Sequence, residues 1–240
     1  TGLPVFAATD TRQAALAEHT WGAAQGISHF CWCTVGTGYG GYLFLEGKPY
    51  DGCHGIAGPF GHNTIDEVNG YPCGCGRRGC VETYVAGPAI ARRGQQALDS
   101  GASPALASLA GTQPVSPSMV ADAFRQGDPA SVQIIEDVVR MIAISLSGVN
   151  NLLDLQLFIL GGGVIHALPE LVGMIDAKIR SYLMSEEAKR DLRITRESFS
   201  NSSLYGAAAL VFQKQPPTGD GDSPGGIASQ QNQTWSKENQ

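Results

Sequence analysis

One histidine and three cysteines between positions 61 and 82 have the types and spacing of a metal site. The candidate ligands are His62, Cys73, Cys75 and Cys80. One imidazole and three thiolates form a Cys₃His set suited to tetrahedral Zn²⁺, and the glycines between them let the backbone fold tightly round an ion. Unrelated buried cysteines, or a disulfide with a spare thiol, are the alternatives. Four protein ligands would fill the coordination sphere, so the predicted zinc is structural rather than a Lewis acid.

Two glycine clusters follow segments with the composition of strands. Gly36, Thr37 and Gly38 separate two runs rich in β-branched and aromatic residues, and Gly161, Gly162 and Gly163 follow the apolar run 156–160. Turns of this kind suggest nucleotide binding, because backbone amides can approach phosphates closely where side chains are small. Neither cluster completes a known phosphate-loop motif. A plain hairpin turn and simple tight packing are the respective alternatives.

Strands and helices that alternate along the chain must position these residues. We expect strands at 3–8, on both sides of the first glycine cluster, at 156–160 and at 192–196. We expect helices at 11–24, 88–98, 118–126, 129–153, 168–184 and 202–213. Residues 100–117 are expected to form a connection. The alternation predicts an α/β domain over residues 1–213, and the polar, Gly/Pro-rich residues 214–240 are expected to form a disordered tail.

Composition excludes several classes of protein. The chain has 240 residues, of which 42% are hydrophobic and 16% charged, so it is not mainly disordered. A formal net charge of −6 argues against a broad electrostatic surface for nucleic acid. The sequence contains no apolar run of about 18 residues and no secretory signal, so we expect neither a membrane span nor export. The crowded cysteines suit a metal better than disulfides, which favours the cytoplasm.

The segment from Gly61 to Glu82 resembles the ROK family (repressors, open reading frames and kinases). The family signature is a Gly-His pair followed by C-x-C-G-x-x-G-C-x-E, and the chain matches every position of it. The resemblance covers about residues 1–213. It implies the actin-like, ribonuclease-H-like fold, with two α/β lobes and a cleft between them. It also implies an ATP-dependent hexose kinase using Mg²⁺, or a sugar-responsive repressor on the same fold; homodimers are common in the family.

The resemblance also implies roles for individual residues. Asp10 stands in the family pattern N-D-[AVG]-N-x-A-A-L-x-E, and there it would take the proton of the attacking sugar hydroxyl. From the residues alone, Asp10 suits a helix N-cap equally well. The first glycine cluster would face the nucleotide phosphates, and the second would border the adenosine pocket.

Glu82 and His62 match the residues with which the family binds sugar. One nitrogen of His62 would bind zinc while the other donates to or accepts from a sugar hydroxyl, so the metal would fix the pocket wall. A solvated carboxylate at a helix start is the alternative for Glu82. Thr9 and Pro59 stand where the family has a sugar-binding Asn and Glu. The preferred sugar, whether glucose or an N-acetylhexosamine, is therefore not predicted.

The family kinases carry an Asp-x-Gly-Gly phosphate loop well before the catalytic Asp, and the sequence from Thr1 contains no such segment. We therefore expect this chain to correspond to the C-terminal lobe of a kinase and to be catalytically poor or inactive by itself. A repressor without its helix-turn-helix arm and an inactive zinc-stabilised remnant are the alternatives for its origin.

Overall fold

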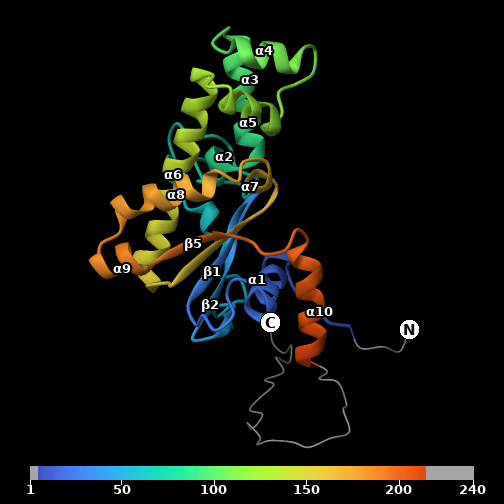
Figure 1. Ribbon diagram of the computed structural model, residues 1–240, viewed down its shortest axis with the longest axis vertical. Helices are drawn as coiled ribbons and strands as arrows, with labels where there is room; N and C mark the ends of the chain where they lie inside the picture. Colours follow the sequence, from blue (N-terminus) through green and yellow to red (C-terminus); the bar gives the residue numbers. More distant parts are fainter. Residues whose placement is uncertain (1–4, 215–240) are drawn as a thin grey trace, which may run out of the picture.

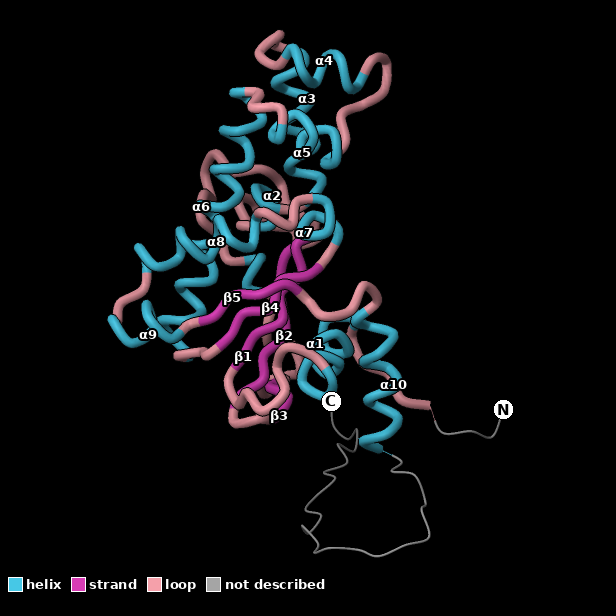
Figure 2. Tube along the Cα trace, viewed as in Figure 1, coloured by secondary structure: helices cyan, strands magenta, loops and turns pink. Residues whose placement is uncertain are grey.

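A five-stranded mixed sheet forms the centre of the protein, whose computed structural model describes residues 5–214 (Figures 1 and 2). In chain order the strands are β1 (Phe30–Val35), β2 (Tyr39–Leu45), β3 (Lys48–Tyr50), β4 (Leu157–Gly161) and β5 (Arg193–Arg196). Their order across the sheet is β3-β2-β1-β4-β5. β1 pairs antiparallel with β2 and parallel with β4, so β1 and β4 end at the same edge of the sheet.

Helices cover both faces of the sheet. One face carries α1 (Asp10–Trp21) and α10 (Ser202–Lys214), and the other carries α6 (Pro129–Leu153) and α8 (Leu171–Ile179). Beyond one end of the sheet lie α2 (Glu82–Val85), α3 (Gly87–Asp99), α4 (Pro104–Ala110) and α5 (Pro117–Arg125). The remaining short elements are α7 (Gly163–Ala167), α9 (Glu186–Asp191) and the 3₁₀ turns η1 (Phe60–His62) and η2 (Arg180–Tyr182). No helix within residues 5–214 is long and apolar enough to cross a membrane.

The alternation of side chains along β1 explains the two cores. Phe30 and Trp32 pack with residues of α1 and α10, whereas Cys31, Cys33 and Val35 pack with α6 on the opposite face. Both cysteines are completely buried and serve as small core residues. The sheet is therefore packed on both faces, and it holds the turns at its edge in fixed positions.

The contact between α1 and α10 is unusually close. A Cβ atom at Gly206 of α10 would lie 1.7 Å from the backbone oxygen of Gln13 in α1, so only glycine fits. Glu18 of α1 is fully buried, and its carboxylate accepts hydrogen bonds from the backbone N–H of Ala23 (2.8 Å) and of Ser198 (2.6 Å). These contacts fix the helix that begins with Asp10.

Most of the expected elements are present, and several boundaries differ. α6 runs from Pro129 to Leu153, as predicted, and Asp128 caps it by accepting from the Ser131 N–H at 2.9 Å. The expected strand at 3–8 is wrong for its described part: residues 5–9 are irregular, and Val5 is 85% exposed because no strand of the sheet lies beside it. The predicted connection 100–117 contains α4, and α7 and α9 were not predicted. Lys214, the first residue of the expected tail, instead ends α10, and 215–240 lie outside the described residues.

Candidate active site

A cavity of about 900 Å³ opens at the sheet edge where β1 and β4 end. Its lining includes nine of the residues singled out from the sequence: Thr9, Asp10, Gly36, Thr37, Gly38, Pro59, Glu82, Gly162 and Gly163. Ligands of α/β proteins bind outside the carboxyl ends of parallel strands, which is where this cavity lies. His62 is not among the described residues that line it, and Gly161 lies behind it at the end of β4.

The two glycine clusters lie side by side at this edge. A Cβ atom at Gly36 would be 3.5 Å from the Gly163 nitrogen, and the Gly36 N–H donates to Gly38 O at 2.9 Å to close the turn. Gly162 has φ +94°, and a side chain there would meet Thr34 and the β1 backbone at 2.8 Å. Apart from Thr37, the two adjacent turns at the cavity carry no side chains, which lets a phosphate chain approach the backbone amides.

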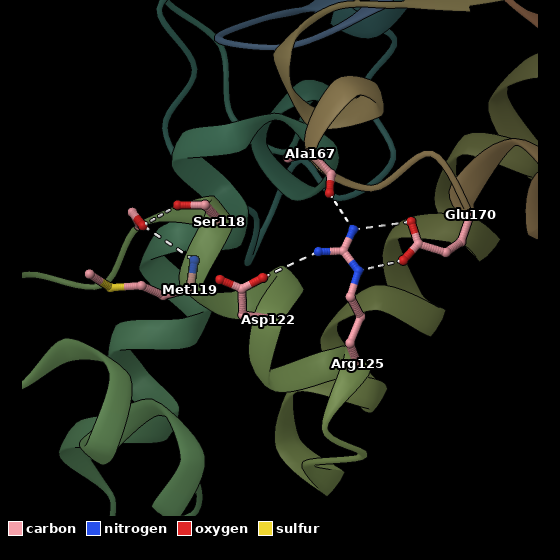
Figure 3. Close-up of polar contacts among 7 residues, drawn as sticks. Ser118, Met119, Asp122, Arg125, Ala167 and Glu170 are labelled. Carbon is pink, nitrogen blue, oxygen red and sulfur yellow. Dashed lines mark hydrogen bonds and ion pairs between the residues drawn. The ribbon is translucent and has the colours of Figure 1, made fainter.

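A second cavity, of about 480 Å³, shares Gly36, Thr37 and Gly163 with the first. Its other walls are mostly apolar and come from the starts of α3 and α5 and from α7. Arg125 of α5 joins two of these walls (Figure 3). Its guanidinium donates to both carboxylate oxygens of Glu170 (2.7 and 3.3 Å) and to the Ala167 carbonyl at 2.5 Å. The pKa of the Glu170 carboxyl is lowered by this bond to Arg125.

Asp10 is the first residue of α1 and is exposed in the cavity. The N-cap of α1 is Thr9, whose hydroxyl accepts from the Arg12 N–H at 3.3 Å, so the capping alternative for Asp10 is wrong. One carboxylate oxygen of Asp10 accepts from the Thr11 N–H at 2.8 Å. This bond orients the Asp10 side chain at the cavity wall, beside the N-terminal end of α1.

Glu82 connects the cavity to the cysteine-rich loop. Its Oε2 accepts from the Tyr39 N–H at 2.9 Å, directly after the first glycine cluster. Its Oε1 lies 3.7 Å from Cys73 Sγ and 3.9 Å from His62 Nδ1. The side chain is part-buried, so Glu82 is a bridging carboxylate and not the solvated one considered as an alternative.

The four predicted metal ligands come together in the structure. One candidate ligand atom from each of His62, Cys73, Cys75 and Cys80 lies within 4.8 Å of the others. The Cys73 Sγ–His62 Nδ1 distance is 3.4 Å and the Cys75 Sγ–Cys80 Sγ distance is 3.6 Å. Ligands of a tetrahedral zinc ion are roughly 3.4–3.8 Å apart, whereas a disulfide needs S–S of about 2 Å. The donor set and its spacing therefore fit a four-coordinate metal ion.

The charge state of two of these thiols differs with their surroundings. Hydrogen bonds from the backbone and side chain of Arg77 lower the pKa of Cys75 to about 6, so this sulfur is readily a thiolate. Burial raises the pKa of Cys80 to about 12 in the metal-free chain. Thiolates are the forms that bind metal, and a bound cation would favour deprotonation of both.

Sequence analysis missed a cluster of three polar residues on the cavity wall. Arg12 Nη1 lies 2.9 and 3.0 Å from the two carboxylate oxygens of Asp51, and the Tyr42 hydroxyl donates to Asp51 Oδ1. Burial, followed by the bond to Asp51, raises the pKa of Tyr42, so it remains a neutral donor. Asp51 is 39 residues from Arg12 in the chain, and no spacing rule connects them.

A second missed residue, Glu197, supports the glycine turn from behind. Its side chain is 5% exposed, and Oε1 accepts from the Gly162 N–H at 3.1 Å and lies 2.7 Å from His166 Nε2. Ser202 donates to the other oxygen at 2.5 Å. A buried carboxylate thus holds the backbone at Gly162, whose φ is positive.

A mixed sheet with helices on both faces, and glycine turns beside a helix-borne carboxylate at its edge, defines an α/β domain, and its similarity to solved ROK sugar kinases assigns it to the actin-like ATPase fold. The ROK family model matches residues 1–214, and the chain belongs to the ROK family.

Relatives of known activity are similar over most of the chain. The glucokinase of Thermotoga maritima is 30% identical over 215 residues, which are 89% of this chain and 68% of the relative. Curated N-acetylmannosamine kinases also match, over 68 to 73% of this chain.

The crystal structure of a ROK family glucokinase from Streptomyces griseus with glucose and AMPPNP is 31% identical to this chain. Its TM-score is 0.79, with 89% of this chain and 70% of that chain covered. A ROK family transcriptional regulator, described as a homolog of the E. coli MLC protein, is also 31% identical. Its TM-score is 0.76, with 88% of this chain and 52% of that chain covered.

Proposed function

We propose that the full-length protein of which this chain forms the C-terminal lobe transfers the γ-phosphate of ATP to a hydroxyl of a hexose, with Asp10 as the general base. The observation that supports this most directly is the single cavity that joins the Asp10 carboxylate, the two glycine turns and Glu82. Phosphoryl transfer needs little covalent chemistry from the protein. It needs a base beside the attacking hydroxyl and backbone amides beside the phosphates, in an aligned arrangement. The sugar kinases among its relatives support the same reaction class.

Each part of the cavity has a role in this proposal. Asp10 accepts the proton of the sugar hydroxyl as that oxygen attacks the γ-phosphorus, and its carboxylate is exposed in the cavity where the hydroxyl would lie. The glycine turns bind the phosphates, together with Mg²⁺, and the apolar cavity beside them holds the nucleoside. Glu82 accepts from a sugar hydroxyl while its second oxygen remains bonded to the Tyr39 N–H.

Zinc has a structural role in the proposal. Its ligands would be His62, Cys73, Cys75 and Cys80, and when bound it would cross-link the loop 60–82 and neutralise the thiolates. Since Glu82 follows this loop directly and lies beside two of the ligands, the ordered loop holds Glu82 against the glycine turn. His62 does not line the cavity, so its contact with the sugar remains a prediction.

Two measurements test the function. Calorimetric titration with AMPPNP and with a hexose panel that includes glucose and N-acetylmannosamine tests binding, and ADP release by the full-length protein tests turnover. We expect Asp10→Asn to leave binding of both ligands within about twofold and to lower turnover by about 10²- to 10⁴-fold. Glu186→Gln is the matched control, because Glu186 is also an exposed acid in the first turn of a helix. A protein that binds neither hexose nor nucleotide would contradict the proposal.

A further inference from the structure

The cavity wall carries a carboxylate that the proposed reaction has not used. Asp51, in the segment after β3, lines the same cavity as Asp10 and Glu82. Arg12 Nη1 is shared between its two oxygens at 2.9 and 3.0 Å, and the Tyr42 hydroxyl donates to Oδ1. Contacts from α1 and from β2 therefore hold this carboxylate in one orientation. Carboxylates fixed in this way are pre-organised acceptors.

Counting acceptor positions shows what remains available on Asp51. Each carboxylate oxygen can accept two hydrogen bonds. Oδ1 accepts from Arg12 and Tyr42 and is full, whereas Oδ2 accepts from Arg12 alone. The side chain is 40% exposed, so the unfilled position of Oδ2 is open to a donor in the cavity. A hydroxyl group is the donor that fits a single such position.

The two carboxylates already assigned, and the residues at positions 9 and 59, offer a sugar few free acceptors. Asp10 is assigned to the reacting hydroxyl, and one oxygen of Glu82 is already bonded to Tyr39. Thr9 uses its hydroxyl to cap α1, and Pro59, which also lines the cavity, has no polar side-chain atom. A hexose that lost the hydrogen bonds of its remaining hydroxyls to water would pay a free-energy penalty unless the wall replaced them.

We propose that Asp51 binds the hexose by accepting a hydrogen bond from one non-reacting ring hydroxyl, and that Arg12 and Tyr42 are its positioning residues. This rests on the proposed function. Arg12 follows Asp10 by two residues in the first turn of α1, so the same helix end holds the base and, through Arg12, the Asp51 carboxylate. The spacing between the reacting hydroxyl and the recognised hydroxyl is thereby fixed, which makes Asp51 a determinant of sugar specificity.

The test is Asp51→Asn in the complete chain, with hexose and AMPPNP affinities measured by calorimetry. The substitution keeps the shape and removes the charge, so hexose affinity is expected to fall about tenfold to a hundredfold while AMPPNP affinity stays within about twofold. Tyr42→Phe removes one hydrogen bond to the Asp51 carboxylate and is expected to lower hexose affinity by less than Asp51→Asn does. Asp137→Asn is the matched control: Asp137 is also held by two contacts, from Arg93 (2.6 Å) and Arg140 (3.1 Å), but lines a different cavity.

Monodeoxy sugars separate recognition from a structural effect. Removal of the recognised hydroxyl should weaken binding to the wild-type protein by the same factor as Asp51→Asn, and should have little further effect in the variant. Asp51 does not bind the sugar if each deoxy sugar loses the same affinity in the wild type and in Asp51→Asn. The same conclusion follows if Asp51→Asn and Asp137→Asn have equal hexose affinity. If the wild-type chain binds no hexose, the proposed function fails and this inference falls with it.

Discussion

The contact between α1 and α10 predicts a large effect of one added methyl group. In Gly206→Ala the new Cβ would lie 1.7 Å from Gln13 O and 2.1 Å from Gln13 C. Both are backbone atoms and cannot rotate away, so the helices must separate by roughly 1.5 Å to reach an ordinary contact. Overpacking of this kind costs about 1–3 kcal/mol, and an obstacle made of backbone places this case near 3 kcal/mol.

Separation of the helices should also lower activity. α1 begins with Asp10, and Ser203 of α10 donates to the Asp10 carbonyl at 3.2 Å. A misplacement of about 1 Å in a reacting group can cost about a hundredfold in rate. We therefore expect Gly206→Ala to lose turnover even where the protein remains folded, with hexose and AMPPNP affinity much less affected.

The assay is urea unfolding followed by circular dichroism, with Gly148→Ala as the control. Gly148 lies in α6 with no atom near the position of a Cβ, so alanine there should raise the free energy of unfolding by about 0.5–1 kcal/mol. Gly206→Ala should thus be less stable than the wild type and Gly148→Ala more stable, so their free energies of unfolding should differ by about 4 kcal/mol. Equal stability of Gly206→Ala and the wild type, with an unchanged m-value, would refute the close helix contact on which the reasoning depends.

Three further predictions concern the loop and the apolar cavity. Chelation of the metal should expose the bonds after Arg77 and Arg78 to trypsin, whereas the metal-bound loop should resist; cleavage independent of chelator would contradict a bound metal. Arg125→Met should weaken AMPPNP binding about threefold to tenfold and leave hexose affinity unchanged, because it releases a wall of that cavity. Arg125 lowers the pKa of Glu170, so the Arg125–Glu170 ion pair stabilises the folded protein fully at pH values above the ordinary Glu pKa. This stabilisation is lost as the pH falls through the lowered pKa of Glu170. Urea titrations at acidic pH should show this loss in the wild type and not in Arg125→Met.

Local patterns predicted the parts of the structure that depend on neighbours in the chain. The helix expected at 129–153 is present as α6, because a capping residue such as Asp128 and an apolar periodicity are local properties of a single helix. The metal cluster was equally accessible, since three ligands lie within eight residues of one another. The strand expected at 3–8 failed because a strand needs a partner, and composition does not reveal whether the sheet supplies one.

The cavity wall was only partly predictable. Asp10, Glu82 and the glycine clusters stand in motifs, whereas Asp51 reaches Arg12 only through the pairing of β2 with β3. Glu197 is a similar case: it is separated from Gly162 by 35 residues and is brought there by the parallel pairing of β4 with β5. Long-range pairings decide which charged residues meet, and a single sequence does not contain them.

The close packing of α1 against α10 has a consequence for synthesis of the chain. The Asp10–Ser203 contact between these helices spans 193 residues, so a ribosome adding about 5–20 residues per second needs roughly 10–40 seconds between the two partners. During that time the face of β1 and β2 that carries Phe30 and Phe44 has α1 but not α10 to cover it. We expect this face to be the surface that chaperones bind on the nascent chain, and its exposure to end once α10 leaves the ribosome.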